Sequence, residues 1–133
     1  MSKLTDSDPL VTVYIPTYNR VELLERAVNS VLEQTYKHIE IIVVDDNSND
    51  NTHEYLKYIS SKDSRIRYFI KEENSGACVS RNIGILNAKG EFITGLDDDD
   101  YFRNDRLELF LNKWNKKSKK TKILYSLYAR KQD

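Results

Sequence analysis

The chain has 133 residues, a length typical of one domain. Its 21 basic and 21 acidic residues cancel to a formal net charge of zero, which argues against a nucleic-acid partner because general nucleic-acid binders need a basic excess. The single cysteine, Cys78, excludes an internal disulfide and fits a reducing compartment. No apolar run approaches the roughly 20 residues that span a bilayer, and the start of the chain lacks the apolar stretch of a secretory signal. We therefore expect a cytoplasmic protein with one hydrophobic core.

Short β-branched runs alternate with amphipathic helical patterns along the chain. The first predicted strand, residues 10–15, ends at Pro16, and apolar residues at three- and four-residue steps predict a helix over 20–36. The next predicted elements, in chain order, are a strand over 39–44, a helix to about residue 60 capped by Asp50 or Asn51, a strand over 66–70, a helix from 76 to 88, a strand over 91–96, a helix over 105–114 and a strand over 123–128. Gly90 stands where a helix end or a turn is expected.

The alternation of strands with crossover-length helices predicts an α/β fold, a three-layer sandwich around a mostly parallel sheet. Ligands bind such sheets beyond the carboxyl ends of the strands. Polar clusters follow three of the predicted strands, at Thr17–Asn19, Asp45–Asn47 and Asp97–Asp100. We expect these three clusters to converge at one edge of the sheet.

Four consecutive carboxylates, Asp97 to Asp100, are the sharpest chemical signal in the chain. A divalent cation would offset their mutual repulsion, and all-oxygen ligands suit Mg²⁺, Mn²⁺ or Ca²⁺. In extended backbone, Asp97 and Asp99 project to the same side. The alternative is a solvated acidic turn before the following helix. An EF-hand is excluded because Tyr101 and Phe102 stand where an oxygen ligand and a glycine belong.

Each of the other candidates has a structural alternative. Asp45 and Asp46 can accept an N–H of a base or a ribose hydroxyl, and they are equally typical of turns and helix caps. Tyr18 can stack on a flat ring or simply pack, and Arg81 can meet a phosphate or the acidic cluster, or lie exposed on its helix. His38 and His53 lack a carboxylate or cysteine partner at metal-ligand spacing and are interpreted as surface residues. Cys78 lacks a nearby histidine and is interpreted as a small packing residue.

Together these segments resemble the family 2 glycosyltransferases, which have the GT-A fold. The matching stretches are VTVYIPTYNR (11–20), SVLEQTY (30–36), IEIIVVDDNSNDNT (39–52), NSGACVSRNIGILNAKGEFITGLDDDD (74–100) and NDRLE (104–108). The likeness runs from about residue 10 to 128. The chain departs from the family at Ser80, where alanine is common, and at Asn104, where proline is frequent.

The resemblance implies a nucleotide-sugar donor, most often a UDP-sugar, bound with Mn²⁺ or Mg²⁺. It implies that Pro16, Thr17 and Tyr18 line the nucleotide pocket, with the aromatic ring over the base. The acid at Asp46 would bond the base, with Asp45 in support.

Further roles follow from the same resemblance. Arg81 would lie near the nucleotide, and the DXD motif maps to Asp97-Asp98-Asp99. Asp97 and Asp98 are thereby assigned to the donor, and Asp99 with Asp97 to the metal. A metal on the diphosphate neutralises charge that develops on the leaving group.

Family members of this kind invert the anomeric centre with a general base from a later segment that also builds the acceptor site. No residue after Leu107 fits that base, so the catalytic residue is unknown and is expected beyond residue 133. We divide the chain into a tail, 1–9, and a GT-A donor-binding domain, 10–133, and expect a truncated protein without the acceptor-binding half.

The predicted function is transfer of a sugar to a glycan or lipid-linked acceptor in glycan or polysaccharide biosynthesis. The alternative is a catalytically incomplete nucleotide-binding fragment or regulatory module. A sugar nucleotidyltransferase would need a Gly-rich loop after the first strand, and a haloacid-type phosphatase would carry its DXD there. The lysine-rich stretch 113–131 is typical of a solvated face. Peripheral association with the inner face of the membrane and a homo-oligomer built on exposed apolar surface both stay open.

Overall fold

The computed structural model describes residues 8–115. In chain order the elements are β1 (Val11–Thr17), α1 (Val21–Leu32), β2 (Ile39–Asp45), α2 (Thr52–Lys62), β3 (Ile66–Ile70), α3 (Ala77–Leu86), β4 (Phe92–Gly95) and α4 (Arg106–Asn115). Every element predicted between residues 10 and 114 is present; the strand over 66–70 keeps its predicted bounds and the ends of the others are shifted. The strand predicted over 123–128 and the lysines after residue 115 lie outside the described residues. None of the described helices is long and apolar enough to cross a membrane.

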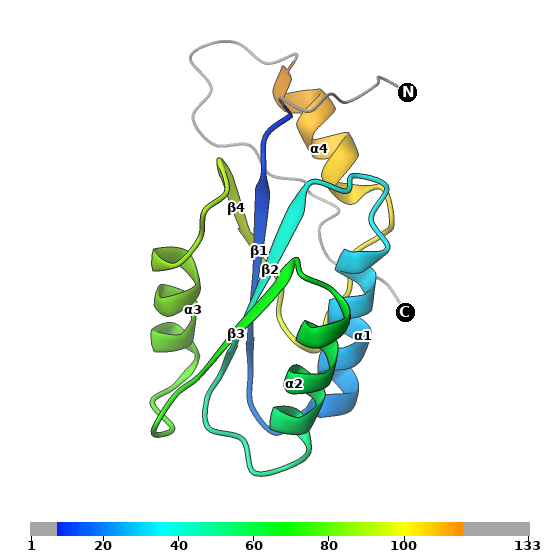
Figure 1. The fold of residues 1–133 in the computed structure, drawn as a ribbon. Coiled ribbons are helices and arrows are strands. Elements are labelled where there is room, and N and C mark those ends of the chain that lie inside the picture. Colours follow the sequence, from blue (N-terminus) through cyan, green and yellow to red (C-terminus); the bar gives the residue numbers. More distant parts are fainter. Residues whose placement is uncertain (1–7, 116–133) are drawn as a thin grey trace.

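The four strands form one parallel sheet in the order β3-β2-β1-β4. Figure 1 shows α3 against one face of the sheet and α1 and α2 against the other. The three-layer α/β sandwich with a parallel sheet is therefore confirmed for the described residues. Because all four strands point the same way, their carboxyl ends meet at one edge.

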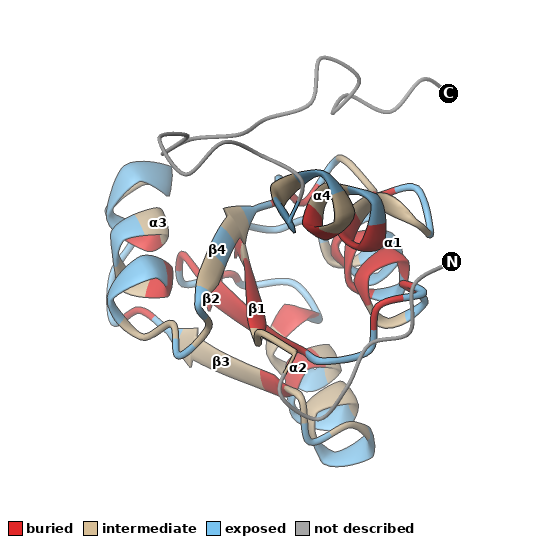
Figure 2. Ribbon diagram, turned by 90° about the horizontal axis from the view of Figure 1, so that it is seen from above, coloured by how far each residue is buried: buried red, intermediate tan, exposed pale blue. Residues whose placement is uncertain are grey.

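Successive side chains of the central strands pack alternately against the helices on the two faces of the sheet. Figure 2 shows that β1 and β2 are largely buried. Val13 and Ile15 of β1 are fully buried in the core, which they share with Leu24 of α1. The side chain between them, Tyr14, faces α3 instead. A Cβ at Gly84 would lie 2.7 Å from the Tyr14 Cβ, so only glycine lets α3 approach β1 this closely.

The strand β1 runs through Pro16 to Thr17, and the prediction that proline ends it is wrong. The Thr17 carbonyl accepts a hydrogen bond from the Asp46 N–H on the β2 side, and the Tyr14 carbonyl accepts one from the Leu96 N–H on the β4 side. The backbone groups of Pro16 therefore face the β4 side, beyond the last pair between β1 and β4. Proline fits there because its missing N–H has no ladder partner to serve.

Helix α1 ends four residues before its predicted end at Tyr36 because tertiary hydrogen bonds replace its last turn. The Gln34 side chain is fully buried, donates from Nε2 to the Arg103 carbonyl at 2.7 Å and accepts the Leu107 N–H at 3.1 Å. The Thr35 N–H donates to the Asn104 carbonyl. These bonds tie the end of α1 to the start of α4.

The amino-terminal end of the sheet is held by the buried carboxylate of Glu40. It accepts hydrogen bonds from Thr12 Oγ1 at 2.6 Å, from the Lys89 N–H at 2.7 Å and from Arg67 Nη2 at 3.0 Å. The Gly90 N–H donates to Thr12 Oγ1 at 2.9 Å. Gly90 is thus no helix cap: α3 ends at Leu86, and the glycine brings the following loop onto β1.

Candidate functional site

A cavity of about 320 Å³ opens at the carboxyl ends of β1, β2 and β4. Its volume lies at the lower end of the range of about 300–1,000 Å³ that is usual for ligand pockets. The lining residues are Pro16, Thr17, Tyr18, Arg20, Asp46, Ala77, Ser80, Arg81, Asp97, Asp98 and Asp99. Eight of the nine residues that the sequence assigns to donor or metal line this one cavity, and Asp45 does not. The predicted convergence of polar strand ends is therefore found in the structure.

Asn19 ties the loops after β1 and β2 together, and each of the two loops holds an asparagine in left-handed backbone. Asn19 has φ 51° and Asn47 has φ 64°. The Asn19 N–H donates to Ser48 Oγ at 2.7 Å, and Asn19 Oδ1 accepts the Asn49 N–H at 2.8 Å. Asparagine tolerates this conformation better than most residues, so the chain can turn sharply after each of these strands.

Asp45 lies behind the cavity and supports the loop that follows β2. Its carboxylate is fully buried and accepts the Ser48 N–H at 2.9 Å, while His53 Nε2 of α2 lies 2.7 Å from Oδ2. The geometry therefore supports a structural role for Asp45 behind the cavity and no direct contact with a nucleotide. The prediction that His53 has no carboxylate partner is wrong, because the loop folds back and brings residues eight apart into contact, although the His53 side chain stays 40 % exposed.

Asp46 stands at the tip of β2 and faces the cavity. Its Oδ1 lies 2.7 Å from Lys71 Nζ and accepts the Ser75 N–H at 2.8 Å, and its Oδ2 accepts the Gly76 N–H at 3.0 Å. Burial would raise the pKa of Asp46, but these hydrogen bonds outweigh it and hold the pKa below its usual value. Asp46 is therefore an ionised acceptor at neutral pH.

Lys71 was not among the predicted site residues, although it directly follows β3. Ligands of parallel sheets lie beyond the carboxyl ends of the strands, so the position of Lys71 directly after the third strand is the signal in the sequence that points to it. Its side chain is 6 % exposed, and the ammonium reaches Asp46, the Gly76 carbonyl at 3.0 Å and Ser80 Oγ at 2.9 Å. These contacts fasten the start of α3 to the tip of β2.

Asp98 turns away from its acidic neighbours and bonds the end of β1. It accepts Thr17 Oγ1 at 2.9 Å and Arg20 Nη1 at 3.1 Å. Burial raises the pKa of Asp98 and the Asp99 charge adds to the rise, while the bonds from Thr17 and Arg20 oppose it. Arg20, also absent from the sequence assignment, thus joins the loop after β1 to the acidic segment.

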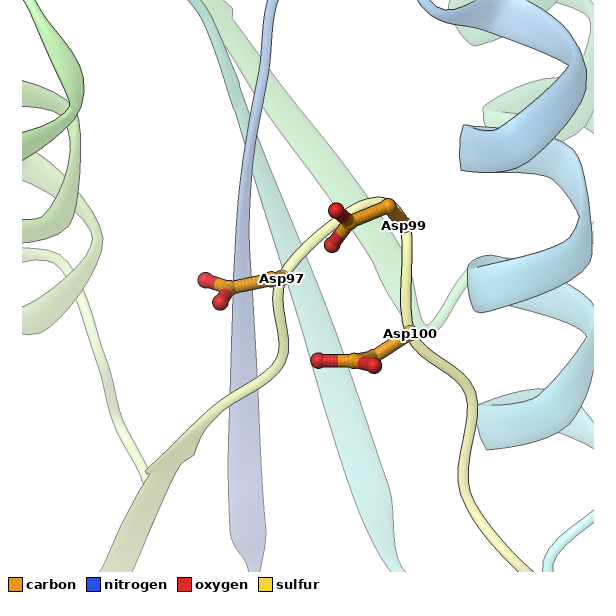
Figure 3. A group of neighbouring side chains, drawn as sticks. All are labelled: Asp97, Asp99 and Asp100. Atoms are coloured by element: carbon orange, nitrogen blue, oxygen red, sulfur yellow. The ribbon is translucent and has the colours of Figure 1, made fainter. Parts of the chain in front are cut away.

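The other three carboxylates of the acidic segment lie together. Figure 3 shows Asp97, Asp99 and Asp100 on one tight loop after β4. Each offers a carboxylate oxygen within 4.8 Å of the others, and the loop is closed by the Asp100 N–H donating to the Asp97 carbonyl at 3.0 Å. Clustered, solvent-accessible carboxylate oxygens are the donor set that Mn²⁺ and Mg²⁺ prefer, so these residues fit such an ion.

Basic side chains border the acidic loop on both sides. Arg81 Nη2 of α3 lies 3.5 Å from Asp97 Oδ1, and Arg20 Nη1 lies 3.5 Å from Asp99 Oδ2. From α1, Arg26 donates to the Asp99 carbonyl at 2.8 Å and lies over the ring of Tyr101. The loop is therefore held from α1 and α3 while the carboxylates of Asp97 and Asp99 stay about half exposed.

The two remaining sequence candidates lie away from any catalytic arrangement. His38 is exposed, as predicted, with Nδ1 2.8 Å from the Asp8 carbonyl oxygen. Cys78 on α3 is exposed, so its interpretation as a packing residue is wrong.

The model of the family described as Glycosyl transferase family 2 matches residues 12–126, and the chain belongs to this family. One relative is the GalNAc(5)-diNAcBac-PP-undecaprenol beta-1,3-glucosyltransferase of Campylobacter jejuni, which is 41 % identical over 108 residues, or 80 % of this chain and 35 % of the relative. The chain spans less than half the length of the curated relatives that it matches.

Two solved structures share the fold. S. aureus TarS 1-349 in complex with UDP-GlcNAc superposes with a TM-score of 0.71 at 30 % identity, covering 77 % of this chain and 31 % of that one. The mannosyltransferase PcManGT from Pyrobaculum calidifontis, in complex with GDP-Man and Mn²⁺, has a TM-score of 0.66 at 28 % identity, covering 73 % of this chain and 29 % of that one. The expected GT-A fold is thereby confirmed.

Proposed function

We propose that the chain binds a UDP-sugar with Mn²⁺ or Mg²⁺ in the 320 Å³ cavity. We propose further that the protein transfers the sugar, with inversion, to a glycan or lipid-linked acceptor in polysaccharide biosynthesis. The observation that carries the proposal is that Tyr18, Asp46 and the Asp97–Asp99 loop, from three separate strand ends, line one cavity. The UDP-GlcNAc complex of TarS supports the donor class, and the undecaprenol-linked substrate in the name of the Campylobacter relative supports a lipid-linked acceptor. Such an acceptor would bring the protein to the inner face of the membrane.

The β1 and β2 side of the cavity provides the contacts for the base. Tyr18, 40 % exposed at the cavity, offers an aromatic face on which a base can stack, a contact worth about 1–3 kcal/mol. Asp46 is an ionised acceptor that suits the N3–H of uracil. Cytosine carries no hydrogen at N3, so a carboxylate in this position favours UDP over CDP.

The acidic loop provides the contacts for the diphosphate. Asp97 and Asp99 would hold the ion, and Asp100 offers a third oxygen. When bound, such an ion supplies positive charge that stabilises the departing diphosphate. Arg81 borders the same part of the cavity and can donate two parallel hydrogen bonds to phosphate oxygens. Asp98 acts through Thr17 and Arg20, by fixing the loop on β1.

A donor-binding module without transferase activity is the second candidate, and the carboxylates of the cavity favour it for this chain by itself. Asp46 is assigned to the base, Asp98 accepts hydrogen bonds from Thr17 and Arg20, and Asp97 and Asp99 are assigned to the metal. Among the residues that line the cavity, no carboxylate is left to take a proton from an acceptor hydroxyl. A general base is worth about 10²–10⁴-fold in rate, so we expect the 133-residue chain to hydrolyse a UDP-sugar slowly without forming a glycoside.

Calorimetry with the 133-residue chain tests donor binding. We expect UDP to bind in the presence of Mn²⁺ and to bind far more weakly after EDTA is added. Asp99→Asn should weaken binding at least about tenfold by removing a charged ligand. Asp105→Asn is the matched control, because this carboxylate lies outside the cavity and pairs with Arg103. UDP affinity that is indifferent to both EDTA and Asp99→Asn would refute the metal assignment.

Incubation of the chain with UDP-GlcNAc, Mn²⁺ and a panel of sugar and lipid-linked acceptors tests transfer. Slow release of free sugar without glycoside is the result we expect of the chain alone. Rapid glycoside formation would show that a base exists within the chain or is supplied by a second subunit.

A further inference from the structure

The ammonium of Lys71 is the most completely engaged buried charge near the cavity. It lies at the carboxyl end of β3, under the loop that leads into α3, with a side chain that is 6 % exposed. An ammonium has three donors, and Lys71 has three acceptors in reach, namely Asp46 Oδ1 at 2.7 Å, Ser80 Oγ at 2.9 Å and the Gly76 carbonyl at 3.0 Å. A charge buried with this geometry holds its partners in one arrangement.

The contacts of Asp46 leave little room for a ligand. A carboxylate offers about four acceptor positions, two on each oxygen. Oδ1 is filled by Lys71 Nζ and the Ser75 N–H, whereas Oδ2 has only the Gly76 N–H. One acceptor position remains, and it is on Oδ2. A ligand in the cavity can therefore give Asp46 one hydrogen bond and no second one.

Resting on the proposed function, we propose that Lys71 is a specificity-determining residue: by occupying Oδ1 of Asp46, it makes the site select bases that present a single N–H and reject guanine. Uracil presents one N–H, at N3, between two carbonyl groups. Guanine presents two adjacent donors, N1–H and the 2-amino group, which bind a carboxylate best through both oxygens. With Oδ1 occupied, the 2-amino group enters the cavity without an acceptor, and an unpaired polar group is costly to bury.

The family relationship leaves this choice open, because TarS was solved with UDP-GlcNAc and PcManGT with GDP-Man. The contact of Lys71 with Asp46 Oδ1 gives a physical reason for the UDP class in this chain. It also separates the role of Lys71 from that of Asp46, since Asp46 selects for an N–H and Lys71 limits how many are accepted.

Inosine diphosphate provides the decisive comparison. Hypoxanthine has the N1–H of guanine and lacks the 2-amino group. The ratio of IDP to GDP affinity therefore reports how many acceptor positions of Asp46 the base can use, and it does not depend on the size of the purine because both bases are purines. With Mn²⁺ present, we expect the unaltered chain to bind UDP best and to bind IDP about tenfold more tightly than GDP. This measurement needs no variant, so it stands even if a substitution at Lys71 prevents folding.

Lys71→Met tests the residue itself by removing the ammonium while keeping much of the buried volume. One acceptor position on Oδ1 then becomes free, and the IDP preference over GDP should fall about tenfold. Burial without the ammonium raises the pKa of Asp46, so binding is measured at pH 8 to keep the carboxylate ionised. Lys57→Met, at an exposed position of α2, is the matched control and should keep the IDP preference.

Three outcomes would overturn the inference. GDP binding as tightly as IDP to the unaltered chain would show that Oδ1 is accessible to the base. A folded Lys71→Met variant with an unchanged ratio would show that Lys71 does not set the number of acceptors. Failure of UDP itself to bind with Mn²⁺ would instead overturn the proposed donor site, and this inference with it.

Discussion

Replacing Glu40 by glutamine tests the network that holds the sheet at the end opposite the cavity. Glu40 is 8 % exposed and joins β1, β3 and the loop before β4 through Thr12, Arg67 and Lys89. Glutamine keeps the shape of the side chain but replaces one acceptor oxygen by an NH₂ group. All three partners of Glu40 donate, so the amide must turn its NH₂ toward a donor.

The expected loss in free energy of unfolding follows from how exposed each partner of Glu40 is. If the amide oxygen stays with Thr12 and Lys89, two hydrogen bonds lose their charged acceptor, at about 1 kcal/mol each. The NH₂ then faces Arg67, whose side chain is about one-third exposed, and that lost pair adds about 1 kcal/mol or less. We expect Glu40→Gln to lower the free energy of unfolding by about 2–3 kcal/mol, a large part of the roughly 5–15 kcal/mol of a typical domain.

The pH dependence of the stability difference shows whether the charge of the Glu40 carboxylate causes it. Burial raises the pKa of Glu40, but bonds from Thr12, Lys89 and Arg67 outweigh it and hold the pKa below its ordinary value of 4.5. A carboxyl with a lowered pKa stabilises the fold above its unfolded pKa, and this contribution is lost as pH falls through the folded value. The stability gap between the unaltered chain and Glu40→Gln should therefore be full at pH 7 and shrink below pH 4.5.

Urea unfolding followed by circular dichroism at pH 7 and pH 3 measures this gap. Other acid-sensitive groups affect both proteins alike, so the difference isolates Glu40. Glu54→Gln, at an exposed position of α2, is the control and should change stability by less than about 0.5 kcal/mol. A gap of the same size at both pH values would refute the reasoning, because a loss that is independent of ionisation cannot come from the carboxylate charge.

Three further predictions concern the cavity and its support. Gly84→Ala should lower the free energy of unfolding by about 1–3 kcal/mol in the same urea assay, because the new Cβ would meet the Tyr14 Cβ at 2.7 Å; an unchanged midpoint would show that α3 can move aside. Thr17→Val should weaken Mn²⁺-dependent UDP binding about tenfold in calorimetry, because Asp98 loses a hydrogen bond that fixes the acidic loop, and equal affinity would remove Thr17 from that role. Asp46→Asn should reduce the preference for UDP over CDP more than it reduces Mn²⁺ dependence, and a preserved preference in competition binding would contradict the assignment of Asp46 to the base.

Much of the fold is readable from local pattern. The β-branched runs at Val11–Thr17 and Ile39–Asp45 become the two central strands, and their alternation with helical periods requires parallel crossovers. Once the strands are parallel, residues that follow them must meet at one edge. The sequence pattern alone therefore predicts that Tyr18, Asp46 and Asp97 lie at one site.

Element ends depend on contacts that a local pattern does not contain. Pro16 continues β1 because β4 is short, and α1 stops early because Gln34 finds partners near α4. In both cases, segments distant in sequence determine which hydrogen bonds are made at the end of the element.

Within the acidic segment, the sequence by itself determined the type of chemistry, a run of carboxylates at a strand end. Only the tertiary structure decided which of them stays exposed at the cavity. Asp98 also lines the cavity, but its carboxylate is buried and bonded to Thr17, 81 residues earlier, while the carboxylates of Asp97 and Asp99 stay about half exposed. Asp45 and Asp46 follow the same rule. The Asp45 carboxylate contacts His53 of α2, and Oδ1 of Asp46 contacts the ammonium of Lys71. A hydrogen bond depends on distances of about 3 Å between groups that the fold brings together, so residue type predicts the chemistry and packing selects the residues that perform it.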